Sequence, residues 1–450
     1  MLARSLLRRI DPIRSLFDTL KKQKTPLGAA EALVELKLAE QTTAQTDVLQ
    51  DLQAEETVVE SIQSIRHAEN HTTAHRDGIF AGLKLCTNLF LRSIETDRPR
   101  DLGVSSFVTA VYRILLENHK SDGPLTRCAL HALFHHCMVS AEGLTHFVDE
   151  LAGEMVMHCI AREYSAKLAK AKEAFDGRFD PTCPAFTVPA ETVEIIDHAL
   201  SVLLLSITRA VENIAVSEDR KLRAIHTALH CLDTLSECAV GPALQHKIWE
   251  FVSYGCSGSL QQCGEVARWF TYQRVGSVIQ TLREAVKLEN TTAQEMFVQC
   301  FFHVFAVFTG DRLGMALDES RAKGLADTIS LSGLPADALA ILRGGHYTQP
   351  ETLCNLLGFL VNISANEPSV RTIHGVETVV RVMERQPDAI VLEKATQLLW
   401  NVLNHPDGVT ACKDLGCEWR IRQAISSGKF AEFTKKLDVL FGEPKPHIAA

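Results

Sequence analysis

The chain alternates apolar stretches of helical spacing with short polar turns from residue 78 to near its end. The stretch "EKATQLLWNVLNHPDGVTACKDLG", residues 393–416, is typical: apolar residues recur three and four apart, a Pro-Asp-Gly turn follows, and a second apolar element begins. Aromatic residues make up only 6% of the chain, whereas Leu, Ala, Val, Glu and Lys recur throughout. This pattern predicts an all-α fold with very little strand.

Two neighbouring segments repeat the same pattern. When Asn362 is placed opposite Asn401, an offset of 39, Leu360 falls on Leu399 and Ile363 falls on Val402. The glycines that follow, Gly375 and Gly416, differ by 41. A period of about 40 residues built only of helices is typical of armadillo or HEAT repeats.

The C-terminal part therefore resembles the armadillo/HEAT family, most clearly over 350–420. Residues 393–416 are similar to the last helix of one armadillo repeat running into the next, and "VRTIHGVETVVRVM" is similar to the glycine-containing start of a repeat. Weaker echoes occur upstream between residues 78 and 345. The resemblance implies an armadillo/HEAT-like α-solenoid, a superhelix of stacked helical repeats, that binds partners rather than catalysing a reaction.

An asparagine inside each apolar helix is the first candidate binding feature. In the armadillo fold that this run resembles, the innermost helix presents an Asn on the concave face, whose amide can donate to and accept from an extended peptide. The resemblance gives this role to Asn362 and Asn401, with Asn88 and Asn213 as further candidates. The alternative is structural: the amide bonds the loop that precedes the next repeat and satisfies backbone groups there.

The nuclear-import adaptors that the run also resembles carry a Trp one helical turn before the ladder Asn. Here that position holds Gln397 before Asn401 and Gly358 before Asn362, so a groove for basic peptides is not reproduced. Gln397 joins the candidate binding residues, and Trp400 is expected to pack in the core.

The segment boundaries follow from composition. We expect a possible targeting segment (1–24), followed by a polar and loosely packed helical segment that leads into the repeats (25–77). The rest divides into irregular repeats (78–173), an exposed loop with three prolines (174–191), further irregular repeats (192–345), armadillo-like repeats (346–442) and a disordered tail (443–450).

The charge of the N-terminal segment suggests a subcellular location. Residues 1–24 hold seven Lys or Arg against Asp11 and Asp18, whereas the whole chain has a net charge of −9. A stripe of Leu and Ile residues lies on the side of the predicted helix opposite these cations, as in a mitochondrial presequence. The mitochondrial matrix is thus the expected location, with the cytoplasm as the alternative. A basic amphipathic helix that is simply part of the fold explains the same pattern.

Cysteine and hydropathy patterns limit the protein class further. Thirteen cysteines, an odd number, are scattered through apolar runs, which indicates buried free thiols in a reducing compartment. No uncharged apolar run reaches the roughly 18 residues that a membrane span requires, so integral membrane insertion is not expected.

No segment carries a recognisable catalytic motif. His131 and His135 have the i, i+4 spacing of zinc ligands, but no Glu of the H-E-x-x-H motif lies between them, and partly buried histidines explain "HALFHHC" better. "GCSGSLQQCG" lacks the G-x-S-x-G pattern, and no phosphate-binding loop occurs. We therefore expect no enzyme activity, no cofactor and no metal.

The sequence predicts a non-catalytic scaffold or adaptor that binds protein partners in a large, mitochondrial, multisubunit complex. One alternative is an RNA-contacting subunit of a mitochondrial ribonucleoprotein or RNA-processing complex, since a helical array can align basic residues into a groove even in an acidic chain. Another is a cytosolic armadillo-type adaptor. The candidate basic patch is made of Lys167, Lys170, Lys172, Arg220, Lys221 and Arg223.

Overall fold

Within the part of the chain that it describes, the computed structural model contains helices and no strands. Helices that follow one another along the chain pack side by side in succession. The predicted fold class, an all-α solenoid, is therefore confirmed. The described residues are 2–40, 42–68, 72–96, 105–149, 151–176, 188–208, 216–235, 242–287, 292–425 and 430–442.

The chain divides into two compact units, Met1–Ala239 and Val240–Ala450. This boundary falls inside the segment 192–345, which the sequence did not suggest dividing. The helices of the N-terminal unit are α1 (Leu2–Lys22), α2 (Pro26–Ala39), α3 (Thr43–Asp51), α4 (Ala54–Arg66), α5 (Thr73–Glu95), α6 (Ser105–Asn118), α7 (Gly123–Val139), α8 (Ala141–Asp149), α9 (Leu151–Asp176), α10 (Ala190–Thr208) and α11 (Glu218–Leu235).

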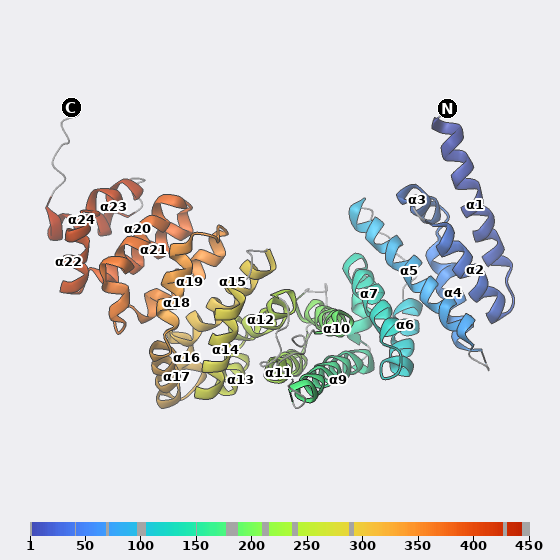
Figure 1. Cartoon of the computed structure of the whole chain (residues 1–450), viewed down its shortest axis with the longest axis horizontal. Coiled ribbons are helices and arrows are strands. Elements are labelled where there is room, and N and C mark those ends of the chain that lie inside the picture. The colour runs from blue at the N-terminus through green and yellow to red at the C-terminus, as the bar shows by residue number, and fades with distance from the viewer. Residues whose placement is uncertain are drawn as a thin grey trace. The chain divides into compact units, whose positions relative to one another are not determined.

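Four helices form the central row of the N-terminal unit. Helix α2 packs on α5, α5 on α7, and α7 on α10 (Figure 1). A second row lies against it, in which α4 contacts α6 and α6 contacts both α8 and α9. Each row helix therefore packs on the next helix of its row, and the second row covers it, as expected for a solenoid.

The beginning of the chain is better packed than the sequence suggested. Ile13, Phe17 and Leu20 of α1 are buried, and α1 contacts α2, α3 and α4. Helices α3 and α4 lie in the segment expected to be loosely packed, yet they bury residues such as Leu49 and Ile62. Their apolar residues are few, but they fall on one face of each helix, and this is enough for packing.

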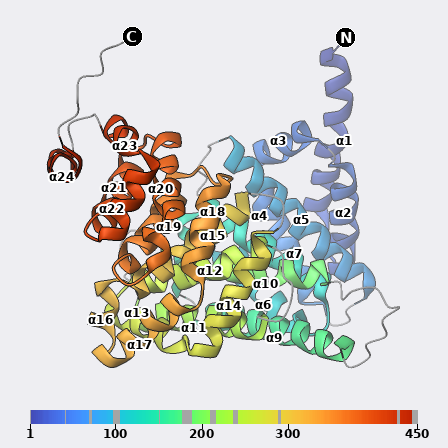
Figure 2. The ribbon, with the colours of Figure 1, turned by 60° about the vertical axis from the view of Figure 1, so that its left-hand side comes forward.

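The C-terminal unit continues the same construction. Its central row runs α12, α15, α19 and α21, each packed on the next (Figure 2). Its elements are α12 (Pro242–Ser257), α13 (Leu260–Trp269), α14 (Tyr272–Ala285), α15 (Thr292–Phe308), α16 (Asp311–Ala316), α17 (Glu319–Leu331), α18 (Leu334–Gly344), α19 (Pro350–Ile363), the 3₁₀ helix η1 (Pro368–Arg371), α20 (Ile373–Arg385), α21 (Ala389–Val402), α22 (Pro406–Leu415), α23 (Glu418–Ala424) and α24 (Ala431–Phe441).

Aromatic side chains fill the core between α12 and α15. The ring of Phe301 stacks on that of Phe305 with centroids 4.6 Å apart, and the Trp249 ring lies 4.6 Å from Phe301. All three side chains are fully buried. Such ring contacts add to the stabilisation from apolar burial alone.

Local capping fixes where the C-terminal helices begin and end. The Thr372 hydroxyl accepts a hydrogen bond from the Gly375 amide at the start of α20. A Cβ on Gly375 would lie 2.3 Å from the Val370 carbonyl oxygen, so the close approach of η1 and α20 requires glycine. Gly416 ends α22 with φ of 56°.

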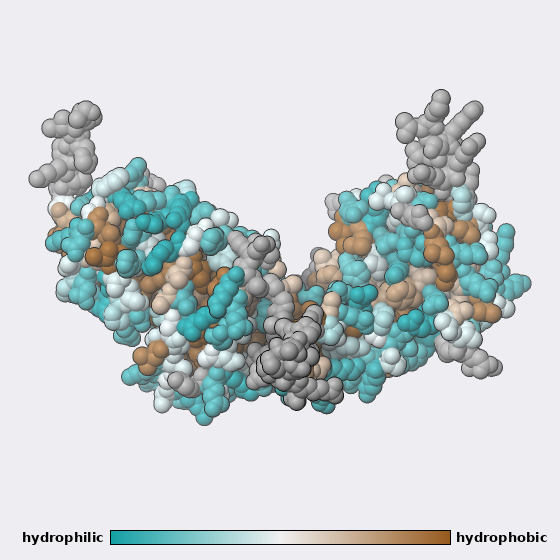
Figure 3. Space-filling view, in the orientation of Figure 1, coloured by the Kyte–Doolittle hydropathy of each residue, from teal (hydrophilic) through white to brown (hydrophobic). Residues whose placement is uncertain are grey.

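Several predicted boundaries fall at the edge of the described residues. Helix α9 continues to Asp176 and α10 begins at Ala190, so both helices extend slightly into the predicted proline loop, most of which lies outside the described residues. The predicted tail 443–450 also lies outside them. On the visible face of each unit, hydrophilic residues predominate and apolar residues form small separate groups (Figure 3).

None of the described helices is by itself long and apolar enough to cross a membrane. Helices α17 and α18 reach the required length and composition only as a pair, and a bend of 53° separates them.

Candidate binding surfaces

The two asparagines of the C-terminal repeats make the same contact. Asn362 on α19 donates from Nδ2 to the Ala306 carbonyl of α15 at 2.7 Å. Asn401 on α21 donates to the Val361 carbonyl of α19 at 3.2 Å and to the Ser364 hydroxyl at 3.1 Å. Both carbonyls lie two residues before the last residue of the preceding row helix, where the regular i+4 amide donor is missing. The Val361 carbonyl also accepts a long hydrogen bond, of 3.4 Å, from the Ser364 amide.

A third side chain takes the corresponding place on α24. Lys436 donates from Nζ to the Trp400 carbonyl at 2.9 Å, and Trp400 lies two residues before the end of α21. Lys436 also lies over the Trp400 ring, 4.2 Å from its centroid. Helix α24 therefore supplies the corresponding donor to the end of α21, although no repeat signal in the sequence marked it.

These contacts answer why an apolar helix carries Asn401: its amide nitrogen satisfies the end of the preceding helix. The loop involved belongs to the preceding repeat, and not to the following one as the structural alternative assumed. Among the described residues no donor contacts the amide oxygens of Asn362 and Asn401. Each side chain thus keeps an acceptor; Asn401 uses both of its N–H groups, whereas Asn362 uses one for the Ala306 carbonyl.

The remaining residues of this surface differ in exposure. Gln397 is exposed on α21 and accepts a weak hydrogen bond from Lys394 at 3.4 Å. A Cβ on Gly358 would meet nothing within 4 Å, so the row is open there. Trp400 was expected in the core but is 37% exposed and lies beside Phe433 of α24, with ring centroids 6.1 Å apart.

The other predicted amides lie in the N-terminal unit. Asn88 on α5 donates to the Glu40 carboxylate at 2.8 Å, and Glu40 directly follows α2 as its C-cap. It therefore links successive row helices as Asn362 and Asn401 do, through a side chain instead of a carbonyl. Asn213 lies outside the described residues.

A groove runs across the central row of the N-terminal unit, with a volume of about 670 Å³. Its lining has three cations, two imidazoles and one carboxylate, with Phe80, Leu91, Thr87, Asn88 and Cys128 between them. The charged and imidazole members are Lys37, Lys84, Arg127, His131, His198 and Glu194. We call this set the row groove.

Imidazole and phenyl rings lie close together in and beside the row groove. The His131 ring lies 4.3 Å from that of His135 and 4.9 Å from that of His198, and Phe134 lies 6.4 Å from His198. Burial, together with His135, His198 and Arg127, lowers the pKa of His131 to about 4. Burial also lowers the pKa of His135. The rings of His131 and His135 are therefore neutral at pH 7.

The basic patch predicted from the sequence is largely engaged inside the unit. Arg220 Nε lies 2.9 Å from a carboxylate oxygen of Glu154, and Arg223 lies 3.7 Å from the other oxygen. Glu154 is buried and also contacts His158 at 3.3 Å. These arginines therefore neutralise a buried carboxylate and do not form a free cationic surface.

The lysines of that patch have different surroundings. Lys172 pairs with Asp176 at 2.5 Å, and Lys167 lies over the Tyr164 ring, 4.1 Å from its centroid. Lys170 is exposed on α9, and Lys221 is half-buried on α11.

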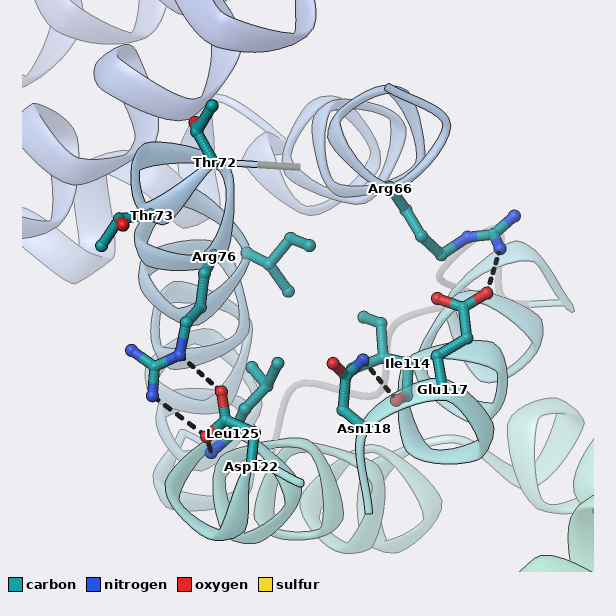
Figure 4. A pocket seen from close by; sticks show the side chains of 10 residues that line it. Arg66, Thr72, Thr73, Arg76, Ile114, Glu117, Asn118, Asp122 and Leu125 are labelled. Atoms are coloured by element: carbon teal, nitrogen blue, oxygen red, sulfur yellow. Dashed lines mark hydrogen bonds and ion pairs between the residues drawn. The ribbon is translucent and has the colours of Figure 1, made fainter. Parts of the chain in front are cut away.

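A second cavity, of about 470 Å³, lies between α4, α5, α6 and α7 (Figure 4). On one side of it Arg76 points to Asp122 in a two-bonded ion pair, and on the other Arg66 pairs with Glu117 at 2.9 Å. The Asp122 carboxylate also caps α7 by accepting from the Leu125 amide, and Arg76 lowers its pKa. These pairs join neighbouring helices, so the cavity is best explained as a packing feature.

Cysteines and histidines do not assemble a metal site in the described part of the chain, where no group of three or more suitable ligands occurs. The described cysteines are free thiols. Cys412 and Cys417 lie 3.2 Å apart between their sulfur atoms, and both are buried. His136 is buried between the rings of Phe90 and Phe107, and burial lowers its pKa to about 3.

Sequence reasoning missed the row groove because its members lie far apart, from α2 to α10. A signal was present in part: Lys84, Asn88 and Leu91 recur at helical spacing on one side of α5. Nothing in the sequence paired that face with His131 of α7 or His198 of α10.

The sequence matches no protein-family profile and no curated protein. Among solved structures, it is similar to a chain from work on a phosphorylation switch in the interaction between cadherin and beta-catenin. The identity is 12% and the TM-score 0.35, over 96% of this chain and 90% of the other. A likeness at this level establishes no family, and the fold assignment rests on the helices described above.

Proposed function

We propose that the protein is a non-catalytic scaffold that binds extended segments of partner proteins along the central row of its C-terminal unit. The observation that carries this proposal is the repeated asparagine contact. Asn362 and Asn401 hold successive row helices in register through their amide nitrogens, and their amide oxygens remain available as acceptors.

An extended peptide offers one backbone N–H per residue, and aligned acceptors can hold it without reading its side chains. This differs from the sequence-based expectation that each amide would both donate and accept. Gln397 is exposed on the same row, and the open space at Gly358 leaves room for a partner side chain. We assign the protein to a multisubunit assembly on this basis.

The experiment compares complexes isolated from cells with a C-terminal tag. Gln397→Arg places a long charged side chain on the row, whereas Lys413→Glu changes an exposed residue of α22 outside it. Gln397→Arg is expected to lose partner proteins that both the wild-type chain and Lys413→Glu retain after nuclease treatment. Equal recovery from all three chains would contradict the proposal.

The mitochondrial matrix is our proposed location, supported by the basic N-terminus. The packing of α1 limits any processing, because Ile13, Phe17 and Leu20 belong to the core. An imported chain should therefore keep residues from about Pro12 onward. N-terminal sequencing of the chain from purified mitochondria tests this, and a first residue beyond Leu20, or recovery only from the cytosol, would contradict it.

A further inference from the structure

The row groove of the N-terminal unit differs in charge from the rest of the protein. The chain has a net charge of −9, yet the groove is lined by three cations against the single carboxylate of Glu194. Lys84 is exposed on α5, where its ammonium lies over the Phe80 ring, 4.3 Å from the centroid. No carboxylate of the described residues forms an ion pair with it.

The other two cations have partners of unequal strength. Arg127 lies 3.0 Å from Glu194, and both side chains are about half exposed, so an incoming anion can replace this contact at little cost. Lys37 lies 2.7 Å from Glu40, which is buried and also accepts hydrogen bonds from Asn88 and Thr46. Lys84 and Arg127 are therefore the cations best able to take a new anion.

Half-exposed rings lie beside these cations. Phe80, His131, Phe134, His135 and His198 are all partly exposed, although aromatic residues are scarce in the chain. The planes of His131 and His198 are inclined by only 33°. A surface with this composition offers planar faces for stacking next to positive charge.

We propose that the row groove binds a short single-stranded stretch of nucleic acid, with phosphates at Lys84 and Arg127 and bases stacked on the rings of Phe80, His131 and His198. Single-stranded nucleic acid is recognised by this combination of cations and stacking faces. Duplexes keep the faces of their bases stacked inside, so these rings have nothing to stack on, and two available cations alone provide little affinity for the phosphates.

An acidic protein segment would meet the same cations but would leave the rings without a matching partner. The rings thus favour a nucleic acid over a peptide. This inference concerns a different unit from the proposed protein-binding row, so either can fail without the other.

The test measures fluorescence anisotropy of labelled twelve-nucleotide oligo(U), oligo(A) and oligo(dT) with the purified full-length chain. Since each phosphate contact contributes about 0.7 to the salt slope for single strands, two contacts predict a slope of about 1.4. Binding to the RNA oligomers alone would assign the groove to RNA, and equal binding to oligo(dT) would assign it to single strands in general. Both outcomes support the proposal.

Variants locate the site. Lys84→Ala should reduce the slope by about 0.7, and His131→Ala should weaken binding by about 5- to 150-fold, the effect of losing one stacked base. Lys120→Ala is the matched control, because it removes an exposed lysine of the same unit from outside both the groove and the candidate basic patch. Unchanged thermal melting shows that each variant is folded.

Three results would overturn the proposal. The first is no binding at 50 mM salt up to 100 µM protein, on the order of the weakest non-specific affinities. The second is an equal effect of Lys84→Ala and Lys120→Ala. The third is displacement of the oligomer by an Asp/Glu-rich peptide at lower concentration than by unlabelled oligo(U). The last result would assign the groove to an acidic protein segment.

Discussion

Replacing Asn401 with alanine tests the structural role of the repeated asparagine most sharply. The change removes hydrogen bonds to the Val361 carbonyl and to the buried Ser364 hydroxyl. With a net contribution of about 0.5–1.5 kcal/mol per bond, the C-terminal unit should lose about 1–3 kcal/mol. Asn362→Ala removes one bond at an exposed side chain and should cost less, about 0.5–1 kcal/mol.

Urea unfolding followed by tryptophan fluorescence measures this difference. All four tryptophans (Trp249, Trp269, Trp400 and Trp419) lie in the C-terminal unit, so the signal reports that unit alone. With a urea dependence of about 2 kcal/mol per molar, Asn401→Ala should lower the midpoint by about 0.5–1.5 M. Gln397→Ala is the control and should leave it unchanged, since Gln397 makes only a weak surface contact.

Asn401→Asp adds a pH test. The introduced carboxylate would face the Val361 carbonyl oxygen without a donor, so the folded state should raise its pKa. Such a group stabilises the fold while protonated and loses this contribution as the pH rises through its folded pKa. The variant should therefore recover stability on acidification relative to Asn401→Ala. A midpoint shift below about 0.3 M for Asn401→Ala, or a larger loss for Asn362→Ala, would refute the reasoning.

Three further changes test other parts of the structure. Gly375→Ala should lower the midpoint of the same urea transition, because its Cβ would clash with the Val370 carbonyl oxygen; no change would contradict the close approach of η1 and α20. Glu154→Gln should destabilise the N-terminal unit by about 3–5 kcal/mol, because it removes the buried negative charge that pairs with Arg220; hydrogen exchange of α9 and α11 measures this. His136 is neutral when folded, so this unit should lose up to about 1.4 kcal/mol per pH unit as the pH falls from 6.5 towards 3. His136→Phe should flatten that dependence in thermal melts followed by circular dichroism, and an unchanged acid dependence would contradict the assignment.

The sequence predicted the repeat because equivalent residues keep their spacing. Leu360 and Leu399 are both buried, and Asn362 and Asn401 make matching contacts. Composition was sufficient for the fold class, since apolar residues at helical spacing can be buried only by stacking.

The sequence failed where a side chain's role depends on a partner that is distant along the chain. Arg220 and Arg223 look like surface cations until Glu154 of α9 is placed beside them. Trp400 looks like a core residue, but only Lys436 and Phe433 of α24 lie against its ring, and it stays partly exposed. The row groove exists only because α2, α5, α7 and α10 pack in succession, which no local pattern specifies.

Photo-crosslinking from the central row tests the scaffold proposal most directly. A benzophenone amino acid replaces Gln397 in one chain and Lys413 in another, and both are expressed in cells and irradiated. We expect position 397 to crosslink to defined peptides of partner proteins and position 413 to yield none of these. Crosslinks to the same peptides from both positions, or none from position 397 while partners still co-purify, would contradict binding along the row.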